Sequence, residues 1–190
     1  MRLFTQSGSS PATSIVDCQN MGYFLTYNGR QGNPVLQFTL SNLLIQNCNS
    51  TGGAAFNLYN NPVNLNFSNM VFTNNIAIGQ FGGAISVENS YLIPGSTCGI
   101  TISNSNFTSN NATGGGGALY FAGCNITCSN TTFTNNVAAA SNTLGGGAIY
   151  SSDQNMNYVY PPNYFENCLV NFKFAIYPIF CSYFEGKYIL

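Results

Sequence analysis

The chain has 190 residues, enough for one domain, and 45% of them are hydrophobic, yet only 5% are charged, against about a quarter in typical soluble domains. Four Lys or Arg and five Asp or Glu give a net charge of −1, so the chain lacks the basic surface that binds nucleic acid or anionic lipid. We therefore expect no nucleic-acid partner and a surface of uncharged polar side chains.

The first segment, residues 1–14, lacks the apolar core of a secretory signal. No run of the chain approaches the 18 or more apolar residues of a membrane span. We interpret residues 1–14 as an N-terminal segment, truncated if the chain is a fragment, and we expect no membrane insertion by any part of this sequence.

From residue 15 onward, a frame of the form hydrophobic-x-hydrophobic-Ser-Asn-x-x-Phe-x-x-Asn recurs. It is complete at 65–75, 100–110 and 126–136, variant at 38–48, degenerate at 158–168 and partial at 15–18. The anchor positions, spaced by 26 to 35 residues, are Ile15, Ile45, Phe72, Phe107, Phe133 and Phe165. A repeat of this length predicts a solenoid.

A second motif, Gly-Gly-Ala, lies between the anchors and leads into short apolar or aromatic runs. Its copies are Gly52-Gly53-Ala54, Gly82-Gly83-Ala84, Gly116-Gly117-Ala118 and Gly146-Gly147-Ala148. Paired glycines suit a corner where backbones approach closely, and the Ser-Asn and Asn-Asn doublets of the frame are typical of tight bends.

Each repeat contains short segments in which apolar and polar residues alternate, as in Leu65-Asn66-Phe67 and Ile100-Thr101-Ile102. This period of two indicates strands with one buried face, and no helical period is evident. Strands joined by corners would stack on their equivalents one turn later, about 4.8 Å away and in parallel. The sequence thus predicts an all-β protein, a parallel β-helix over residues 15–168 with about five to six turns.

Equivalent positions should form columns along the axis of such a solenoid. We expect the anchors to stack in the interior. The column three residues later contains Cys18, Cys48, Asn75, Asn110, Asn136 and Cys168, whose asparagines we expect to hydrogen-bond from turn to turn. Residues 169–190 are rich in aromatic residues and lack both motifs, which indicates either a cap on the last turn or a tail.

The seven cysteines contain no CxxC, and the chain has no histidine, so we expect no zinc or other metal site and no cofactor. Cys98 and Cys124 each precede the first strand residue of their frame by two positions, which would stack them within disulfide distance. Cys18 and Cys48 share a column in the same way. Two disulfides would imply an oxidising compartment; the alternative is buried free thiols.

Six Asn-x-Ser/Thr sequons occur, as expected by chance in so Asn-rich a chain. We select Asn111, expected in a loop before Gly114, as a glycosylation site if the source is eukaryotic.

The sequence contains few combinations of residues that could form a catalytic site. Serine or cysteine triads would normally need a histidine base, and the run from Gly114 to Gly117 lacks the lysine of a phosphate-binding loop. The nearest approach to a carboxylate pair is Glu88 with Asp153, two turns apart and roughly 10 Å from each other, near the spacing of an inverting glycosidase. We expect no enzyme, with polysaccharide processing as the alternative.

Gly-Gly-Ala interleaved with Phe72-x-x-Asn75, Phe107-x-x-Asn110 and Phe133-x-x-Asn136 resembles the repeats of the chlamydial polymorphic outer-membrane proteins. The resemblance covers roughly residues 15–168 and implies a right-handed parallel β-helix. It also implies an extracellular or cell-surface passenger region, linked in that family to adhesion and self-association.

We therefore interpret the chain as a non-catalytic structural or adhesive segment of a larger secreted or surface protein. It would bind protein, glycan or a second copy of itself through its outward polar side chains; the alternative is an enzyme or binding module for polysaccharide. We expect two outward ranks, one of Thr39, Asn66, Thr101 and Thr127, the other of Thr73, Thr108 and Thr134.

Overall fold

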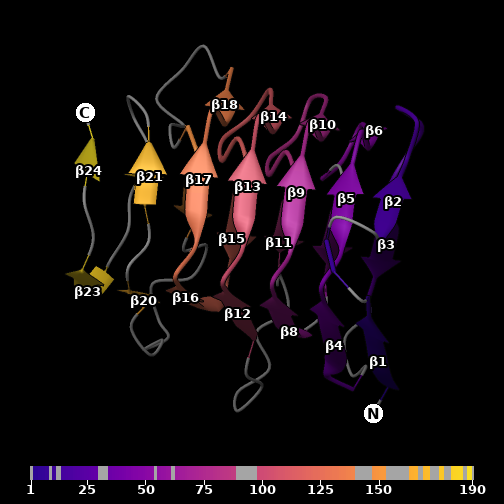
Figure 1. Cartoon of the computed structure of the whole chain (residues 1–190), viewed down its shortest axis with the longest axis horizontal. Helices are drawn as coiled ribbons and strands as arrows, with labels where there is room; N and C mark the ends of the chain where they lie inside the picture. The colour runs from indigo at the N-terminus through magenta and orange to yellow at the C-terminus, as the bar shows by residue number, and fades with distance from the viewer. Residues whose placement is uncertain are drawn as a thin grey trace.

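The chain folds as an all-β parallel solenoid in the computed structural model (Figure 1). The structure describes residues 2–8, 10–11, 14–29, 34–53, 55–60, 63–88, 98–139, 147–152, 163–166, 169–171, 176–177, 181–185 and 188–189. Over these residues every pair of neighbouring strands is parallel, and no helix occurs.

The strands form four sheets, which we call sheets 1 to 4 in the order in which the chain visits them. Sheet 1 contains β1(Arg2–Ser7), β4(Leu36–Ser41), β8(Val63–Ser68), β12(Gly99–Ser103), β16(Asn125–Ser129), β20(Asn163–Glu166) and β23(Cys181–Glu185). Sheet 2 contains β2(Ile15–Asp17), β5(Leu44–Gln46), β9(Val71–Thr73), β13(Asn106–Thr108), β17(Thr132–Thr134), β21(Leu169–Asn171) and β24(Tyr188–Ile189). Sheet 3 contains β6(Asn49–Ser50), β10(Ile76–Ala77), β14(Asn111–Ala112) and β18(Val137–Ala138). Sheet 4 contains β3(Leu25–Asn28), β7(Phe56–Tyr59), β11(Ile85–Glu88), β15(Leu119–Ala122), β19(Ile149–Ser152) and β22(Ile176–Tyr177).

A complete turn contributes one strand to each sheet, and the described chain makes four such turns: β4 to β7, β8 to β11, β12 to β15 and β16 to β19. The expectation of five to six turns is therefore slightly too high. The flanking groups β1 to β3, β20 to β22 and β23 to β24 contribute no described strand to sheet 3. Counting anchors overestimated the complete turns because one anchor marks a single strand and does not show whether the turn contributes to all four sheets.

The sheets also extend beyond the predicted bounds of 15 and 168. β1 pairs along its whole length with β4, while β21, β23 and β24 add to sheets 1 and 2 at the other end. Figure 1 shows the two chain ends at opposite ends of the solenoid. Backbone pairing needs no sequence motif, so strands lie outside the region that the repeats delimit.

The interior is filled by the alternating apolar residues of the strands. Phe107 lies between Phe72 and Phe133, with ring centroids 4.8 Å away on either side and rings tilted by only 11° and 10°. All three rings are fully buried, as is Ile45 at the next position of this column. The predicted stack is therefore present in the four complete turns.

At both ends of this column the anchor assignment is wrong. Ile15 pairs with Leu44 and is 52% exposed, whereas Val16 pairs with Ile45. Phe165 belongs to sheet 1, where it pairs with Cys128, and Val170 is the residue opposite Phe133. The terminal copies of the frame lack its Ser-Asn doublet, so nothing in the sequence marks the corner from which the register is counted.

Asparagines form the corners after the strands of sheets 1 and 2. Left-handed backbone with φ between 46° and 56° occurs at Asn42, Asn69, Asn104, Asn130, Asn47, Asn74, Ser109 and Asn135. Asn tolerates this conformation better than other residues that carry a side chain. The Ser-Asn and Asn-Asn doublets therefore mark the bends as predicted.

Candidate functional site

The Gly-Gly-Ala motif forms the corner that leads into sheet 4. Gly82 and Gly116 have φ of 69° and 68°. A Cβ added to Gly83 or Gly117 would lie 2.1 or 2.2 Å from the carbonyl oxygen of Gly117 or Gly147 one turn later. The Ala84 amide donates to the Ala118 carbonyl, and the Ala118 amide to that of Ala148, both at 2.9 Å. These residues stack corners on one another, which is a structural role.

The first copy of the motif is offset by one residue. Phe56 pairs with Ile85, so Ala55 occupies the place that Ala84 takes in the next turn. Added Cβ atoms at Gly52 and Gly53 would lie 2.4 Å from the side chains of Asn57 and Ser86. Both glycines therefore pack against the outer face of sheet 4. Ala54 and Gly146 lie outside the described residues.

The predicted asparagine column is a continuous hydrogen-bond ladder inside the solenoid. Asn136 Oδ1 accepts from the amide and Nδ2 of Asn110, and Asn110 Oδ1 accepts from the same two groups of Asn75, at 2.9 to 3.2 Å. Each Nδ2 also donates to a backbone carbonyl, those of Ile45, Phe72 and Phe107. Asn75 Oδ1 accepts from the Cys48 amide at 3.1 Å. These buried amides bond to the protein itself, which leaves them no part in ligand binding.

The cysteines occupy two kinds of position. Disulfide bonds join Cys18 to Cys48 and Cys98 to Cys124, with Cα atoms 4.7 and 4.6 Å apart. Cys128 is a buried thiol in an apolar position of β16. Cys168 lies outside the described residues. Within the described ranges, no group of three or more His, Cys, Asp or Glu side chains is placed to hold a metal ion.

Only one member of the predicted carboxylate pair, Glu88, lies among the described residues. Glu88 ends β11 on the outer face of sheet 4 and is half-buried. Asp153 lies outside the described residues. The Glu88–Asp153 separation therefore remains a prediction.

Asn111 does not lie in a loop as expected. It begins β14, where it pairs with Ile76 and Val137, and its amide donates to the Asn75 carbonyl. Its Oδ1 is buried and accepts no hydrogen bond from the described protein atoms. The bend at Ser109 leads into this two-residue strand, as the bend at Asn74 does one turn earlier, and a strand of two residues is too short for a sequence pattern to reveal. Glycosylation at Asn111 remains a prediction.

The two predicted polar ranks lie in register on the outside. Thr39, Asn66, Thr101 and Thr127 pair in succession across sheet 1, and Thr73, Thr108 and Thr134 do so across sheet 2. Asn66, Thr101 and Thr127 are exposed, while the sheet 2 threonines are half-buried. Both ranks present hydroxyl groups at the spacing of the strands, and Asn66 adds an amide to the rank on sheet 1.

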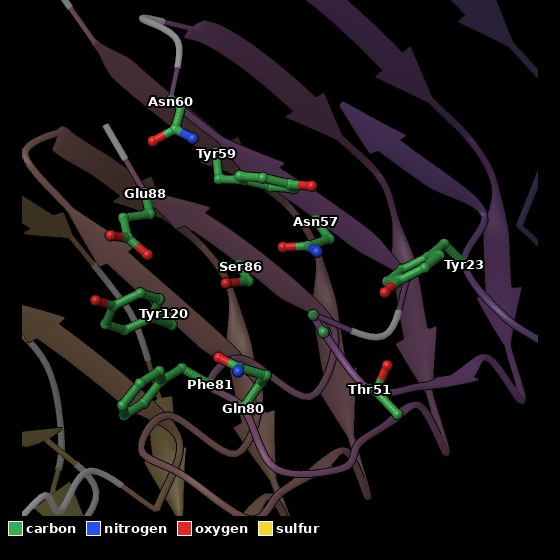
Figure 2. Close-up of a pocket in the computed structure, with 12 residues that line it drawn as sticks. Tyr23, Thr51, Asn57, Tyr59, Asn60, Gln80, Phe81, Ser86, Glu88 and Tyr120 are labelled. Carbon is green, nitrogen blue, oxygen red and sulfur yellow. The ribbon is translucent and has the colours of Figure 1, made fainter. Parts of the chain in front are cut away.

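A hollow that the sequence did not predict lies on the outer face of sheet 4 (Figure 2). We call it the sheet 4 groove. It has a volume of about 320 Å³, and its lining includes Tyr23, Asn57, Tyr59, Phe81, Glu88 and Tyr120. Figure 2 shows Asn57 and Ser86 between Tyr120 on one side and Tyr23 on the other.

The groove exists because one outward rank changes side-chain size along the solenoid. Successive strands place Thr26, Asn57, Ser86, Tyr120 and Tyr150 opposite one another. Ser86 is the smallest of them, and the corner glycines Gly52 and Gly53 beside it add no side chain. The groove is therefore deep at this position, and aromatic side chains from neighbouring turns form its sides.

Three aromatic rings stack outside the main core at one end of the groove. Phe81 stacks on Tyr120 with centroids 4.6 Å apart, and Tyr150 lies 5.7 Å from Phe81 and 5.6 Å from Tyr120. Tyr120 and Tyr150 are only 3% and 7% exposed. Such stacks hold their rings in place, so this wall of the groove is fixed before any ligand arrives.

The sequence contained a signal for the groove that pattern reasoning overlooked. Tyr120 and Tyr150 occupy the second strand position after Gly-Gly-Ala, where an outward polar residue is expected. Only the register brings them together with Phe81 and Tyr59, which belong to other turns. Aromatic residues at outward positions would have been the clue.

Comparison with known proteins identifies the repeats. Residues 69–88 and 130–152 match the Chlamydia polymorphic membrane protein repeat. These segments contain Phe72, Asn75 and Gly82-Gly83-Ala84 in one turn, and Phe133, Asn136 and Gly146-Gly147-Ala148 in another. No curated protein and no solved structure matches the chain significantly. No helix among the described residues is long and apolar enough to cross a membrane.

Proposed function

We propose that this parallel β-solenoid, which carries repeats of the Chlamydia polymorphic membrane protein type, is a non-catalytic adhesive segment of a larger secreted or cell-surface protein. The repeat match supports a surface location, since proteins of that family are surface proteins. The two disulfides support it independently, because such bonds persist in oxidising compartments.

The observation that carries the proposal is the arrangement of polar groups in the solenoid. The interior asparagines bond to the protein itself, whereas Asn66, Thr101 and Thr127 form an exposed rank in register on sheet 1. Among the described residues, the polar groups that a binding partner could contact therefore lie on the outer faces of the solenoid. Solenoids commonly bind partners through the extended surfaces that their stacked repeats create.

A carbohydrate-processing enzyme is the second candidate, because Glu88 lines the sheet 4 groove. An enzyme would release oligosaccharide from a polysaccharide, and Glu88→Gln or Asp153→Asn would abolish that release. An adhesive segment would bind without turnover. Release of reducing ends by the wild-type chain but not by Glu88→Gln would favour the enzyme.

The adhesive proposal is tested with beads that carry the oxidised chain and are mixed with cultured epithelial cells. One variant removes the sheet 1 hydroxyls (Thr39→Ala, Thr101→Ala, Thr127→Ala), and its matched control removes those of sheet 2 (Thr73→Ala, Thr108→Ala, Thr134→Ala). We expect wild-type beads to capture cells well above albumin-coated beads, and the sheet 1 variant to capture several-fold fewer cells than the sheet 2 control. If wild-type beads captured no more cells than albumin-coated beads, the proposal would be contradicted.

A further inference from the structure

We propose that the sheet 4 groove binds a proline-rich segment in the extended polyproline II conformation. This inference rests on the proposed adhesive function and names a class of partner for one further face of the solenoid. Proline-rich linkers adopt this conformation, and proline also occurs in the stalks of some surface proteins. The polar ranks of sheets 1 and 2 take no part in it.

The groove is accessible from solvent. Thr51 and Gln80 in its lining are exposed, and Tyr23, Asn57 and Tyr59 are half-buried. Its volume of about 320 Å³ lies at the lower end of the range for ligand pockets, roughly 300 to 1,000 Å³. A groove of this size holds a few residues of a longer chain.

The strands beneath the groove cannot pair with a further strand. A peptide in the β conformation binds by pairing with an exposed sheet edge. β7 already pairs with β3 and β11, and β11 with β7 and β15. A peptide bound there must therefore be recognised by side chains. The polyproline II helix suits such recognition, because it has no internal hydrogen bonds and its backbone carbonyls are free to accept them.

Aromatic rings form two walls that can enclose a proline ring. Figure 2 shows Ser86 between the rings of Tyr59 and Phe81. Phe81 stacks on Tyr120, with ring centroids 4.6 Å apart. Aromatic-lined grooves are recurring docking sites for proline-rich segments. Ser86 has the smallest side chain of its rank, which leaves space between the walls for a pyrrolidine ring.

The spacing of the turns matches the repeat of the polyproline II helix. Tyr59 lies in β7 and Tyr120 in β15, two strands further on, and this offsets them by about 9.6 Å along the solenoid axis. The polyproline II helix rises about 3.1 Å per residue with three residues per turn, or about 9.3 Å per turn. Prolines three residues apart can therefore contact Tyr59 and the Phe81–Tyr120 stack at the same time.

Carboxamides in the lining can donate hydrogen bonds to such a peptide. Asn57, Asn60 and Gln80 line the groove, and each carries an NH₂ group with two donor hydrogens. One Asn60 donor bonds to Asn28 Oδ1 at 3.2 Å, which orients that side chain. A run of prolines offers acceptors only, because proline has no backbone N–H. A lining that contains amide donors complements it.

The proposed recognition does not depend on charge. Glu88 is the only charged residue among those that line the groove, and a run of prolines carries no charge. Binding is therefore independent of the interactions that Glu88 makes within the protein.

Both sides of the proposed contact are preformed. Phe81 is packed against Tyr120 and Tyr150, and the register of β7 and β11 is fixed on both sides. Proline fixes its own φ, so a polyproline II helix exists before it binds. Little conformational entropy is lost when two preformed surfaces meet, which favours measurable binding by a short peptide.

The test uses the full oxidised chain and two capped peptides, heptaproline made of L-proline and the same peptide made of D-proline. The peptides share composition and hydrophobicity, but the D-peptide forms a helix of the opposite hand. Chitotriose, a neutral sugar, probes the alternative occupant. Titration followed by NMR gives Kd for each probe.

The variants are Tyr59→Ala and Tyr59→Phe. Val137→Ala is the control, since Val137 is 51% exposed at the start of β18 in sheet 3 and does not line the groove. Circular dichroism and thermal melting verify that each variant folds. The comparison of the two peptides needs no variant, so it tests the inference even if Tyr59→Ala does not fold.

We expect L-heptaproline to bind with Kd of about 1 mM or tighter, and the D-peptide and chitotriose to bind at least about tenfold more weakly. Tyr59→Ala should weaken binding of the L-peptide about tenfold or more, Tyr59→Phe, which keeps the ring, by less, and Val137→Ala by less than about threefold. The inference is overturned if L-heptaproline does not bind, if the D-peptide or chitotriose binds as well, or if Tyr59→Ala binds as wild type does.

Failure here is distinguishable from failure of the adhesive function. If wild-type beads capture cells but L-heptaproline does not bind, the groove inference is wrong and adhesion stands. If L-heptaproline binds to a chain whose beads capture no cells, the adhesive proposal is wrong and the groove remains a peptide site.

Discussion

Phe107 illustrates how one side chain contributes to this fold. Its ring is fully buried and stacks on Phe72 and Phe133 in the turns on either side, so its removal would empty a site that two neighbouring turns share. Thr101, one strand earlier in the same turn, is exposed on sheet 1. The pair tests the assignment of inside and outside directly.

We predict that Phe107→Ala lowers the free energy of unfolding by roughly 3 to 5 kcal/mol, because it leaves a cavity in a packed interior. Thr101→Ala should change it by no more than about 0.5 kcal/mol. Denaturant unfolding followed by circular dichroism measures both values. Equal effects of the two substitutions would contradict the arrangement of the column.

Asp17 gives a residue-scale prediction about pH. Its carboxylate accepts hydrogen bonds from the Gln19 amide at 2.8 Å, from Gln46 Nε2 at 2.8 Å and from Asn47 Nδ2 at 3.2 Å, and these bonds lower its pKa below the usual value. A lowered pKa in the folded state means that the interaction stabilises the fold above the ordinary pKa of an aspartate. That contribution is lost as the pH falls through the lowered value.

NMR titration of the Asp17 carboxyl should therefore show a midpoint below that of an unstructured aspartate, 3.8. Gln46→Ala removes one of the donors and should move the midpoint upward. The Asp17 side chain is exposed to solvent, so we expect only a small effect on global stability. An unchanged midpoint in Gln46→Ala would show that this bond is not formed in solution.

At the scale of the element, the corners set the spacing of the turns. Gly117 is in contact with the backbone of the next turn, since an added Cβ would lie 2.2 Å from the Gly147 oxygen and 2.5 Å from backbone atoms of Val137. Gly79 also lies in a bend, with φ of 76°, but an added Cβ would meet nothing within 4 Å. Substitutions at these two glycines therefore distinguish the cost of steric crowding from the cost of a left-handed backbone.

We predict that Gly117→Ala destabilises the fold by more than about 2 kcal/mol, because the corner must move away from its neighbour. Gly79→Ala should cost about 1 kcal/mol, the strain of a left-handed alanine. Thermal and denaturant unfolding compare the two variants. A smaller loss in Gly117→Ala than in Gly79→Ala would mean that the corners are not tightly stacked.

At the scale of the whole molecule, stability should vary along the axis. Each turn contacts only its neighbours, as in other solenoids. β8 and β12 pair on both sides within sheet 1, whereas β1 is the terminal strand of that sheet and pairs with β4 alone. Opening β1 therefore breaks half as many interfaces as opening an interior strand.

We predict that backbone amides of β8 and β12 exchange with deuterium more slowly than those of β1, by on the order of 100-fold. Hydrogen exchange followed by NMR measures this ratio strand by strand. Uniform protection along sheet 1 would indicate that the solenoid opens only as a single unit.

The sequence by itself determined the class of fold, the inward column and the nature of the corners. Phe72, Phe107 and Phe133 recur at one place in a frame whose apolar residues alternate, and periodic burial of this kind has few structural solutions. The ladder of Asn75, Asn110 and Asn136 follows from the same frame, because buried amides need hydrogen-bond partners and equivalent residues of neighbouring turns can supply them. Around Ile15 and Phe165 the frame is incomplete, and the register predicted from it is wrong there.

Only the tertiary structure decided the register of the terminal turns, the number of complete turns and the sheet 4 groove. Phe81, Tyr59 and Tyr120 come from different turns and share no motif, and the depth of the groove depends on the small Ser86 between larger neighbours. The physical reason is that a repeat specifies which positions are equivalent, whereas a surface site depends on how those positions differ from one turn to the next.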